Sequence, residues 1–236
     1  LHRRLAQYRT TRRTRKDRKR RQLVGAADRI VWERCDSELE ASVTEVRLIQ
    51  ALRPRENIAG AFPFLYPFVG IHADGRETHF CLTTSPEAFL SFEFHGAFRS
   101  RDVTGEAFFA LMRLLRFVGH ATPRRRRDRG TIERHSHVYT FRRLPPDWPG
   151  MWAVFLRGAS RAALEHLCLR LLEQAGARAR SAEIQEELRA VQRLFDDEAA
   201  PLAAAIASTG YAGYPVPQRD RDALFLRHRD RRRLAT

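Results

Sequence analysis

The chain has 236 residues, enough for one large domain or two small ones with a buried core. Hydrophobic residues make up 43% and charged residues 30%, which excludes wholesale disorder. No run of 18 apolar residues occurs, so we expect no transmembrane helix and no membrane partner. The formal net charge of +15 favours binding to a polyanion. Nucleic acid is the first candidate, an anionic membrane surface is the alternative, and a merely solvated charged face is the third interpretation.

Three cysteines, Cys35, Cys81 and Cys168, are far apart in the sequence. An odd and sparse set is typical of a reducing compartment and argues against a disulfide framework. No two of them have the spacing of metal ligands. We therefore expect a cytoplasmic, nucleoid-associated protein.

The first 21 residues carry much of the charge. Leu1, Leu5 and Tyr8 recur at helical spacing, which predicts a helix that ends near Arg9. A basic connector follows, then a helix over residues 18–27 and a strand over residues 29–34. The residues that we expect to contact nucleic acid in this region are Arg3, Arg9, Arg12, Arg13, Arg15, Lys16, Arg18 and Lys19.

The stretch "DSELEASVTEVRLIQALRPREN", residues 36–57, is typical of one helix. Ser37 followed by Glu40 forms a capping box, and Pro54 predicts an end near Leu52. On this helix Glu45 falls within an apolar stripe. A carboxylate in such a place is paired with a cation, protonated, or bound to a metal. Pairing with one of the many arginines and binding of a divalent metal are both open at this point.

The rest of the sequence predicts a mixture of strands and helices. Residues 62–71, broken by two prolines, suggest a linker, and the tail at residues 227–233 is expected to be frayed. Expected strands cover 78–83, 89–95, 138–142 and 152–156; expected helices cover 104–118, 160–174 and 181–197. A loop at residues 123–129 is a second basic patch.

"LHRRLAQY", residues 1–8, together with the stretch from residue 36 to 57, resembles the GIY-YIG nuclease domain in the form found in the excinuclease component UvrC and its shorter relative Cho. "FPFLYPFVGI", "FHGAFRS" and "FLRG" resemble later segments of UvrC. The likeness covers residues 1 to about 200, with specific motifs only up to Asn57. The matching positions in the first two segments are Leu1, Arg4, Leu5, Tyr8, Ser37, Glu38, Glu40, Ala41, Glu45, Leu48, Ile49, Pro54 and Asn57.

The resemblance implies a role for four residues. Glu45 would hold the catalytic Mg²⁺ or Mn²⁺, and Arg4 would contact the scissile phosphate. Tyr8 would help to position water or phosphate, and Asn57 would brace the site. From the residues alone, Arg4 is equally a plain phosphate contact, Tyr8 a core-edge residue and Asn57 a turn residue.

The chain departs from the family in three ways. It starts after the two strands that give the family its name and that supply the general-base tyrosine, so we expect it to be part of a longer gene product and not a complete nuclease alone. The region that carries an iron–sulfur cysteine cluster in UvrC has no cysteine here, so no such cluster is expected. The second nuclease domain and the helix-hairpin-helix motifs of UvrC are also missing.

We expect an α+β fold in three parts: residues 1–60, the remainder of a GIY-YIG domain with a small antiparallel sheet flanked by helices; 61–157, a middle α+β region; and 158–236, a helical region with a basic tail. The resemblance implies a structure-specific DNA endonuclease in repair. The alternative is a non-catalytic nucleic-acid-binding protein on a decayed nuclease fold, and a protein–protein adaptor is a third possibility.

Two further features allow more than one interpretation. The helix pair within residues 160–197 is either an ordinary packing layer or a docking hairpin for a UvrB-like loading protein. His120, His135 and His137 are either polar strand residues or zinc ligands.

Overall fold

The computed structural model describes residues 22, 24–52, 54, 66–122 and 136–234. Its contacts divide the chain into two compact units, residues 1–61 and 62–236, and each unit is described by itself. Helices and one antiparallel sheet give an α+β fold, as predicted.

In the first unit, helix α3 (Glu38–Leu52) begins as the capping box requires. The Ser37 hydroxyl accepts the Glu40 backbone N–H at 3.0 Å, and the Glu40 carboxylate accepts the backbone N–H of Asp36 at 2.7 Å. One orphan donor of the first turn is thereby satisfied, and the second bond fixes the backbone just before the N-cap. The predicted start, and the end before Pro54, are confirmed.

The strand predicted at residues 29–34 is wrong, because the structure gives this segment no regular secondary structure. Ile30, Val31 and Trp32 are largely exposed. Strand-forming residues need a partner strand to pair with, and these have none in the described part of the chain. Of the helix predicted at residues 18–27, the described residues 22 and 24–26 are helical.

The second unit contains a five-stranded sheet in the order β3-β1-β2-β5-β4, with every neighbouring pair antiparallel. The strands are β1 (Phe68–Ala73), β2 (Glu77–Thr83), β3 (Glu93–His95), β4 (His120–Ala121) and β5 (His137–Arg142). The predictions for β2 and β5 are confirmed. The segment predicted as a linker contains the start of β1, and the strand predicted at 89–95 is reduced to β3, since the 3-10 turn η2 (Pro86–Ala88) and a loop precede it.

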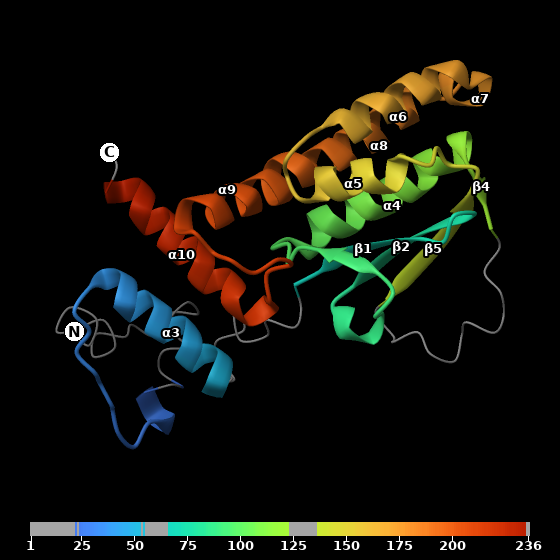
Figure 1. Cartoon of the computed structure of the whole chain (residues 1–236). Helices are drawn as coiled ribbons and strands as arrows, with labels where there is room; N and C mark the ends of the chain where they lie inside the picture. Colours follow the sequence, from blue (N-terminus) through green and yellow to red (C-terminus); the bar gives the residue numbers. More distant parts are fainter. Residues whose placement is uncertain (1–21, 23, 53, 55–65, 123–135, 235–236) are drawn as a thin grey trace. The chain divides into compact units, whose positions relative to one another are not determined.

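Helices cover one face of this sheet (Figure 1). Helix α4, predicted at 104–118, begins three residues earlier, where the Ser100 hydroxyl accepts the Val103 backbone N–H at 3.1 Å. The described helices of the second unit are α4 (Arg101–Val118), α5 (Trp148–Leu156), α6 (Ala162–Glu173), α7 (Ala175–Arg178), α8 (Ser181–Leu194), the π-helical turn η4 (Phe195–Ala199), α9 (Ala200–Thr209) and α10 (Gln218–Leu234).

Residues 152–156 form the end of helix α5 and not the predicted strand. Trp148, Trp152, Phe155 and Leu156 are all buried, and their spacing places them on one helical face. Pro149 lies in the first turn, where its fixed φ suits a helix and its missing N–H costs no hydrogen bond. The aromatic composition suggested a strand, but packing of one helical face decided the outcome.

The basic tail is also more ordered than predicted, since residues 227–233 belong to helix α10. This helix packs on α9, and its Leu224 and Arg221 are buried. Tertiary contacts therefore hold a segment whose charge alone indicated fraying.

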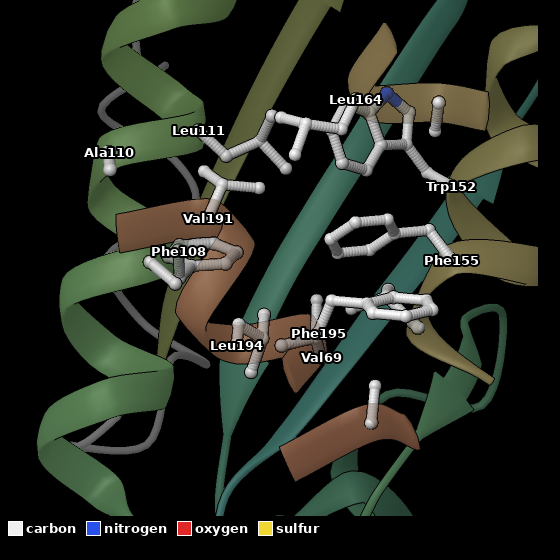
Figure 2. Packing of buried hydrophobic residues seen from close by; sticks show 14 of the residues in the cluster. Val69, Phe108, Ala110, Leu111, Trp152, Phe155, Leu164, Val191, Leu194 and Phe195 are labelled. Carbon is white, nitrogen blue, oxygen red and sulfur yellow. The ribbon is translucent and has the colours of Figure 1, made fainter. Parts of the chain in front are cut away.

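The larger of two hydrophobic clusters in the described residues joins the helical layer to the sheet (Figure 2). The rings of Trp152 and Phe155 lie 5.2 Å apart between centroids, and Phe195 packs 5.1 Å from Phe155. Core residues extend from Val69 to Leu224, so the core is continuous across the boundary expected at residues 157/158. No helix in the described ranges is both long and apolar enough to cross a membrane.

The helix pair α6 and α8 contributes Leu167, Leu171, Val191 and Leu194 to this core. α8 lies against α4 along its length. The inner faces of the pair thus serve as a packing layer, and docking of a UvrB-like protein on its outer faces stays a prediction.

Candidate metal and nucleic-acid sites

Glu45 lies on the exposed side of α3. The apolar stripe beside it is largely uncovered: Leu48 is 52% and Leu52 is 73% exposed, and Val43 is the buried residue of the helix. Water therefore satisfies the carboxylate, and burial does not force it to find a cation. No hydrogen bond or ion pair joins Glu45 to another described residue, so the expected pairing with an arginine is not found in that part of the chain.

The partners that the resemblance implies for Glu45 lie outside the described residues. These are Arg4, Tyr8 and Asn57, and the same holds for the basic residues expected to contact nucleic acid, Arg3, Arg9, Arg12, Arg13, Arg15, Lys16, Arg18 and Lys19. Of the four predicted catalytic residues, Glu45 is the one that lies in the described part of the chain.

One cluster of metal-type ligands appears that the sequence patterns did not suggest. Asp74, Glu77 and His79 meet at the β1–β2 hairpin, with ligand atoms within 4.8 Å of one another. One oxygen of Asp74 accepts the backbone N–H groups of Arg76 and Glu77, which lowers the pKa of its carboxyl, and Glu77 pairs with Arg142 at 2.6 Å. These contacts already account for the cluster as a hairpin turn. The signal in the sequence was the Asp-Gly turn followed by alternating polar residues on one strand.

His120 and His137 cannot bind the same zinc ion. His120 pairs with Arg142 across the β4–β5 ladder, while His137 is five residues away along β5. At about 3.4 Å per residue they lie roughly 17 Å apart, far beyond the span of one ion. His137 instead packs against Phe109, with ring centroids 5.0 Å apart, and His135 lies outside the described residues.

A buried polar network connects α10 to the rest of the unit. Arg221 is 4% exposed and Glu198 is 6% exposed, with their charged groups 3.9 Å apart. The Arg221 Nε donates to the Ala97 carbonyl at 3.1 Å, and the Tyr66 hydroxyl donates to Asp222 at 2.7 Å. Burial is the main cause that lowers the pKa of Arg221 and raises the pKa of Tyr66. No local pattern indicates that Arg221 pairs with Glu198 or Tyr66 with Asp222, because the two partners of each pair are distant in the chain.

Near this network, His95 is completely buried. Its Nδ1 is 3.0 Å from the Tyr214 hydroxyl, while no described residue forms a hydrogen bond with its Nε2. Burial lowers the pKa of His95 to about 4. The ring is therefore neutral at pH 7 and acts as a packing element.

A surface groove between α4 and α8 is lined by charged residues. Arg113 pairs with Glu187 at 2.6 Å, and Arg193 pairs with Glu106 at 2.7 Å. The charges lining the groove are thus mutually neutralised, which leaves little net attraction for a charged ligand.

Comparison of the chain with protein-family models, curated proteins and solved structures gives no match.

Proposed function

We propose that the protein carrying this chain is a UvrC-like, divalent-metal-dependent DNA endonuclease that acts in DNA repair. The observation that carries the proposal is the state of Glu45: its carboxylate is exposed on a capped helix with the predicted bounds, and no described residue engages it. A carboxylate in that condition is available to a divalent cation, which can in turn bind a substrate phosphate.

The donor set fits Mg²⁺ or Mn²⁺. Such ions are commonly held by one or two carboxylates and complete their shell with water and substrate phosphate, so a single glutamate suffices. A bound ion would supply Lewis acidity and stabilise charge on the leaving oxygen. By resemblance, Arg4 would hold the scissile phosphate, Tyr8 would orient water or phosphate, and Asn57 would brace the site.

The second candidate is a nucleic-acid-binding protein without catalysis. The net charge of +15 supports it, because phosphate contacts by arginine need no catalytic group. A UvrB-like loading protein is a proposed partner under the first function only.

The test compares Glu45→Gln with Glu33→Gln in the protein that carries this chain. Both glutamates are exposed and lie in the same unit, so the two variants remove the same charge, one from α3 and one from the segment before it. Mg²⁺-dependent cleavage of DNA should be lost in Glu45→Gln and kept in Glu33→Gln, while both bind DNA as the parent does.

Cleavage by the Glu45→Gln variant at the parental rate would refute the metal assignment. Salt-dependent DNA binding by all three proteins, with no cleavage by any of them at any Mg²⁺ or Mn²⁺ concentration, would establish the second candidate.

A further inference from the structure

The charges of the second unit are segregated between its helices. Residues 161–200, from the start of α6 to the start of α9, hold six arginines and eight acidic residues. Helix α10 holds seven arginines and three aspartates within 17 residues. The attraction for a polyanion is therefore concentrated at α10 and not spread evenly over the helical layer.

The arginines of the α6–α8 region are largely occupied by carboxylates. Arg161 pairs with Asp196 at 2.5 Å and Arg170 with Glu173 at 3.0 Å. The other pairs are Arg180 with Glu183, Arg189 with Glu186 and Arg193 with Glu106. A phosphate would have to compete with each of these carboxylates.

The arginines in the second half of α10 are in a different state. Arg227 and Arg229 are exposed, and neither forms a hydrogen bond or ion pair with any residue in the described ranges. Arg231, also exposed, donates to the backbone carbonyl of Ser208, which leaves its charge uncompensated. At the other end of the helix, the side chain of Arg219 is 80% exposed. Its Nε lies 3.9 Å from a carboxylate oxygen of the neighbouring Asp220.

Helix-dipole stabilisation does not account for this pattern. Cations favour the last turn of a helix, which explains Arg231, Arg232 and Arg233. The effect falls off within that turn, so it gives little reason for Arg227 and Arg229. A ligand contact gives one.

Helix α10 is held firmly enough to present these side chains. Gln218 donates to the Thr84 carbonyl at 2.7 Å, and His228 lies 2.6 Å from the Ser208 hydroxyl on α9. Together with buried Arg221 and Leu224, these contacts anchor one side of the helix along most of its length. The arginines thus project from a fixed support.

The apolar side of α10 is already used for packing. Leu224 is buried, and Phe225 packs against the core cluster. A helix that lies in a membrane interface needs a free apolar face to insert, and Leu234 is the one strongly exposed large apolar residue that the described part of α10 offers. Phosphates that are met in water suit this surface better than a lipid bilayer does.

We propose that Arg227 and Arg231, which lie about one turn apart on the same side of α10, bind the phosphate backbone of duplex DNA without reading its sequence. Residues 227–231 span about 6 Å along the helix, and one DNA strand presents a phosphate every ~3.4 Å along its axis, so two or three phosphates lie within reach. Contacts of this kind position a protein on DNA and carry no base specificity. The proposal rests on the proposed function in that it takes DNA as the partner.

The experiment is a salt series of binding to a short labelled DNA duplex, measured by fluorescence anisotropy. The test variant is Arg227→Gln/Arg231→Gln, which removes the two arginines on that side of the helix. The matched control is Arg170→Gln/Arg189→Gln, which removes the same charge from arginines that are paired on α6 and α8. All four arginines are exposed, so unfolding midpoints should stay near the parental value and establish that both variants fold.

Each lost phosphate contact reduces the slope of log K against log salt by about 0.9, so the test variant should lose about 1.8 from the slope. If binding at 1 M salt is unchanged, this corresponds to roughly 60-fold weaker binding at 0.1 M salt. The control should keep the parental slope.

An equal change of slope in both variants, or none in the test variant while the parent binds, overturns the α10 assignment and leaves the proposed function intact. A parent that fails to bind duplex DNA at all overturns both. Vesicles with anionic lipid at the same ionic strength form the second arm: binding to them that exceeds DNA binding and is lost in the test variant would replace DNA by a membrane surface.

Discussion

Replacing Glu198 by alanine should strongly destabilise the second unit. This carboxylate accepts the backbone N–H groups of Arg99 and Ser100, the latter at 2.9 Å, immediately before α4 begins. It also lies 3.9 Å from the buried guanidinium of Arg221. Truncation therefore leaves two donors without their acceptor, and it removes one of the two carboxylates near the buried cation, since Asp222 stays 3.7 Å from Arg221.

The size of the loss follows from these contacts. Removing one partner of a buried ion pair costs about 3–5 kcal/mol. For a unit of this length, each kcal/mol lowers Tm by about 2–4 °C, so Glu198→Ala should lower Tm by ~6–20 °C. The free energy of unfolding is measured by urea titration at pH 7, with the slope m checked for two-state behaviour.

Asp197→Ala is the matched control, because Asp197 is the adjacent, exposed acid on the same π-helical turn. It should change the free energy of unfolding by less than ~0.5 kcal/mol. The double variant Glu198→Gln/Arg221→Met should recover part of the loss, since it removes both charges together. A loss below ~1 kcal/mol for Glu198→Ala would refute the assignment of a tightly coupled buried network.

Two further predictions concern stability. Gly158 has a φ of +74°, and a Cβ there would lie 2.3 Å from the Ala199 carbonyl oxygen, so Gly158→Ala should cost more than ~2 kcal/mol in urea unfolding. Gly105→Ala, in α4 with open space around the new Cβ, should instead stabilise by ~0.5–1 kcal/mol, and equal effects of the two would contradict the packing argument. Burial lowers the pKa of His95 from 6.5 to about 4, so between these values the unfolded chain binds a proton that the folded chain does not. This contribution makes stability fall as pH drops from about 6.5 to 4, by up to ~3 kcal/mol, and His95→Gln should flatten that part of the pH profile of the urea midpoint.

Local sequence signals predicted several elements well. The capping box at Ser37 and Glu40 and the stop before Pro54 placed α3 within a residue, because both act through backbone groups only a few positions away. The alternation in β2 and β5 and the apolar spacing in α4 were equally local, and they correctly indicated an α+β fold. The nucleic-acid contacts expected of residues 3–19 and the partners expected for Glu45 stay predictions, since those residues lie outside the described part of the chain.

Elements that depend on distant partners could not be predicted in the same way. Residues 29–34 and 152–156 have similar strand-like compositions, yet one has no regular structure and the other is a buried helix. The exposure of Glu45 also depends on what covers the stripe beside it, which a helical wheel does not contain.

The sequence by itself determined the surplus of positive charge, the fold class and the ends of α3, since composition, periodicity and capping are properties of the chain or of a few adjacent residues. Tertiary structure alone decided which arginines are neutralised by carboxylates that are distant in the chain. Their positions in the sequence do not reveal these partners. Folding places Arg193 beside Glu106 and Arg221 beside Glu198, and it leaves Arg227 and Arg229 exposed to water. Electrostatic attraction depends on distance in space, and residues 87 or 23 positions apart are brought within ion-pair range only by the packed core.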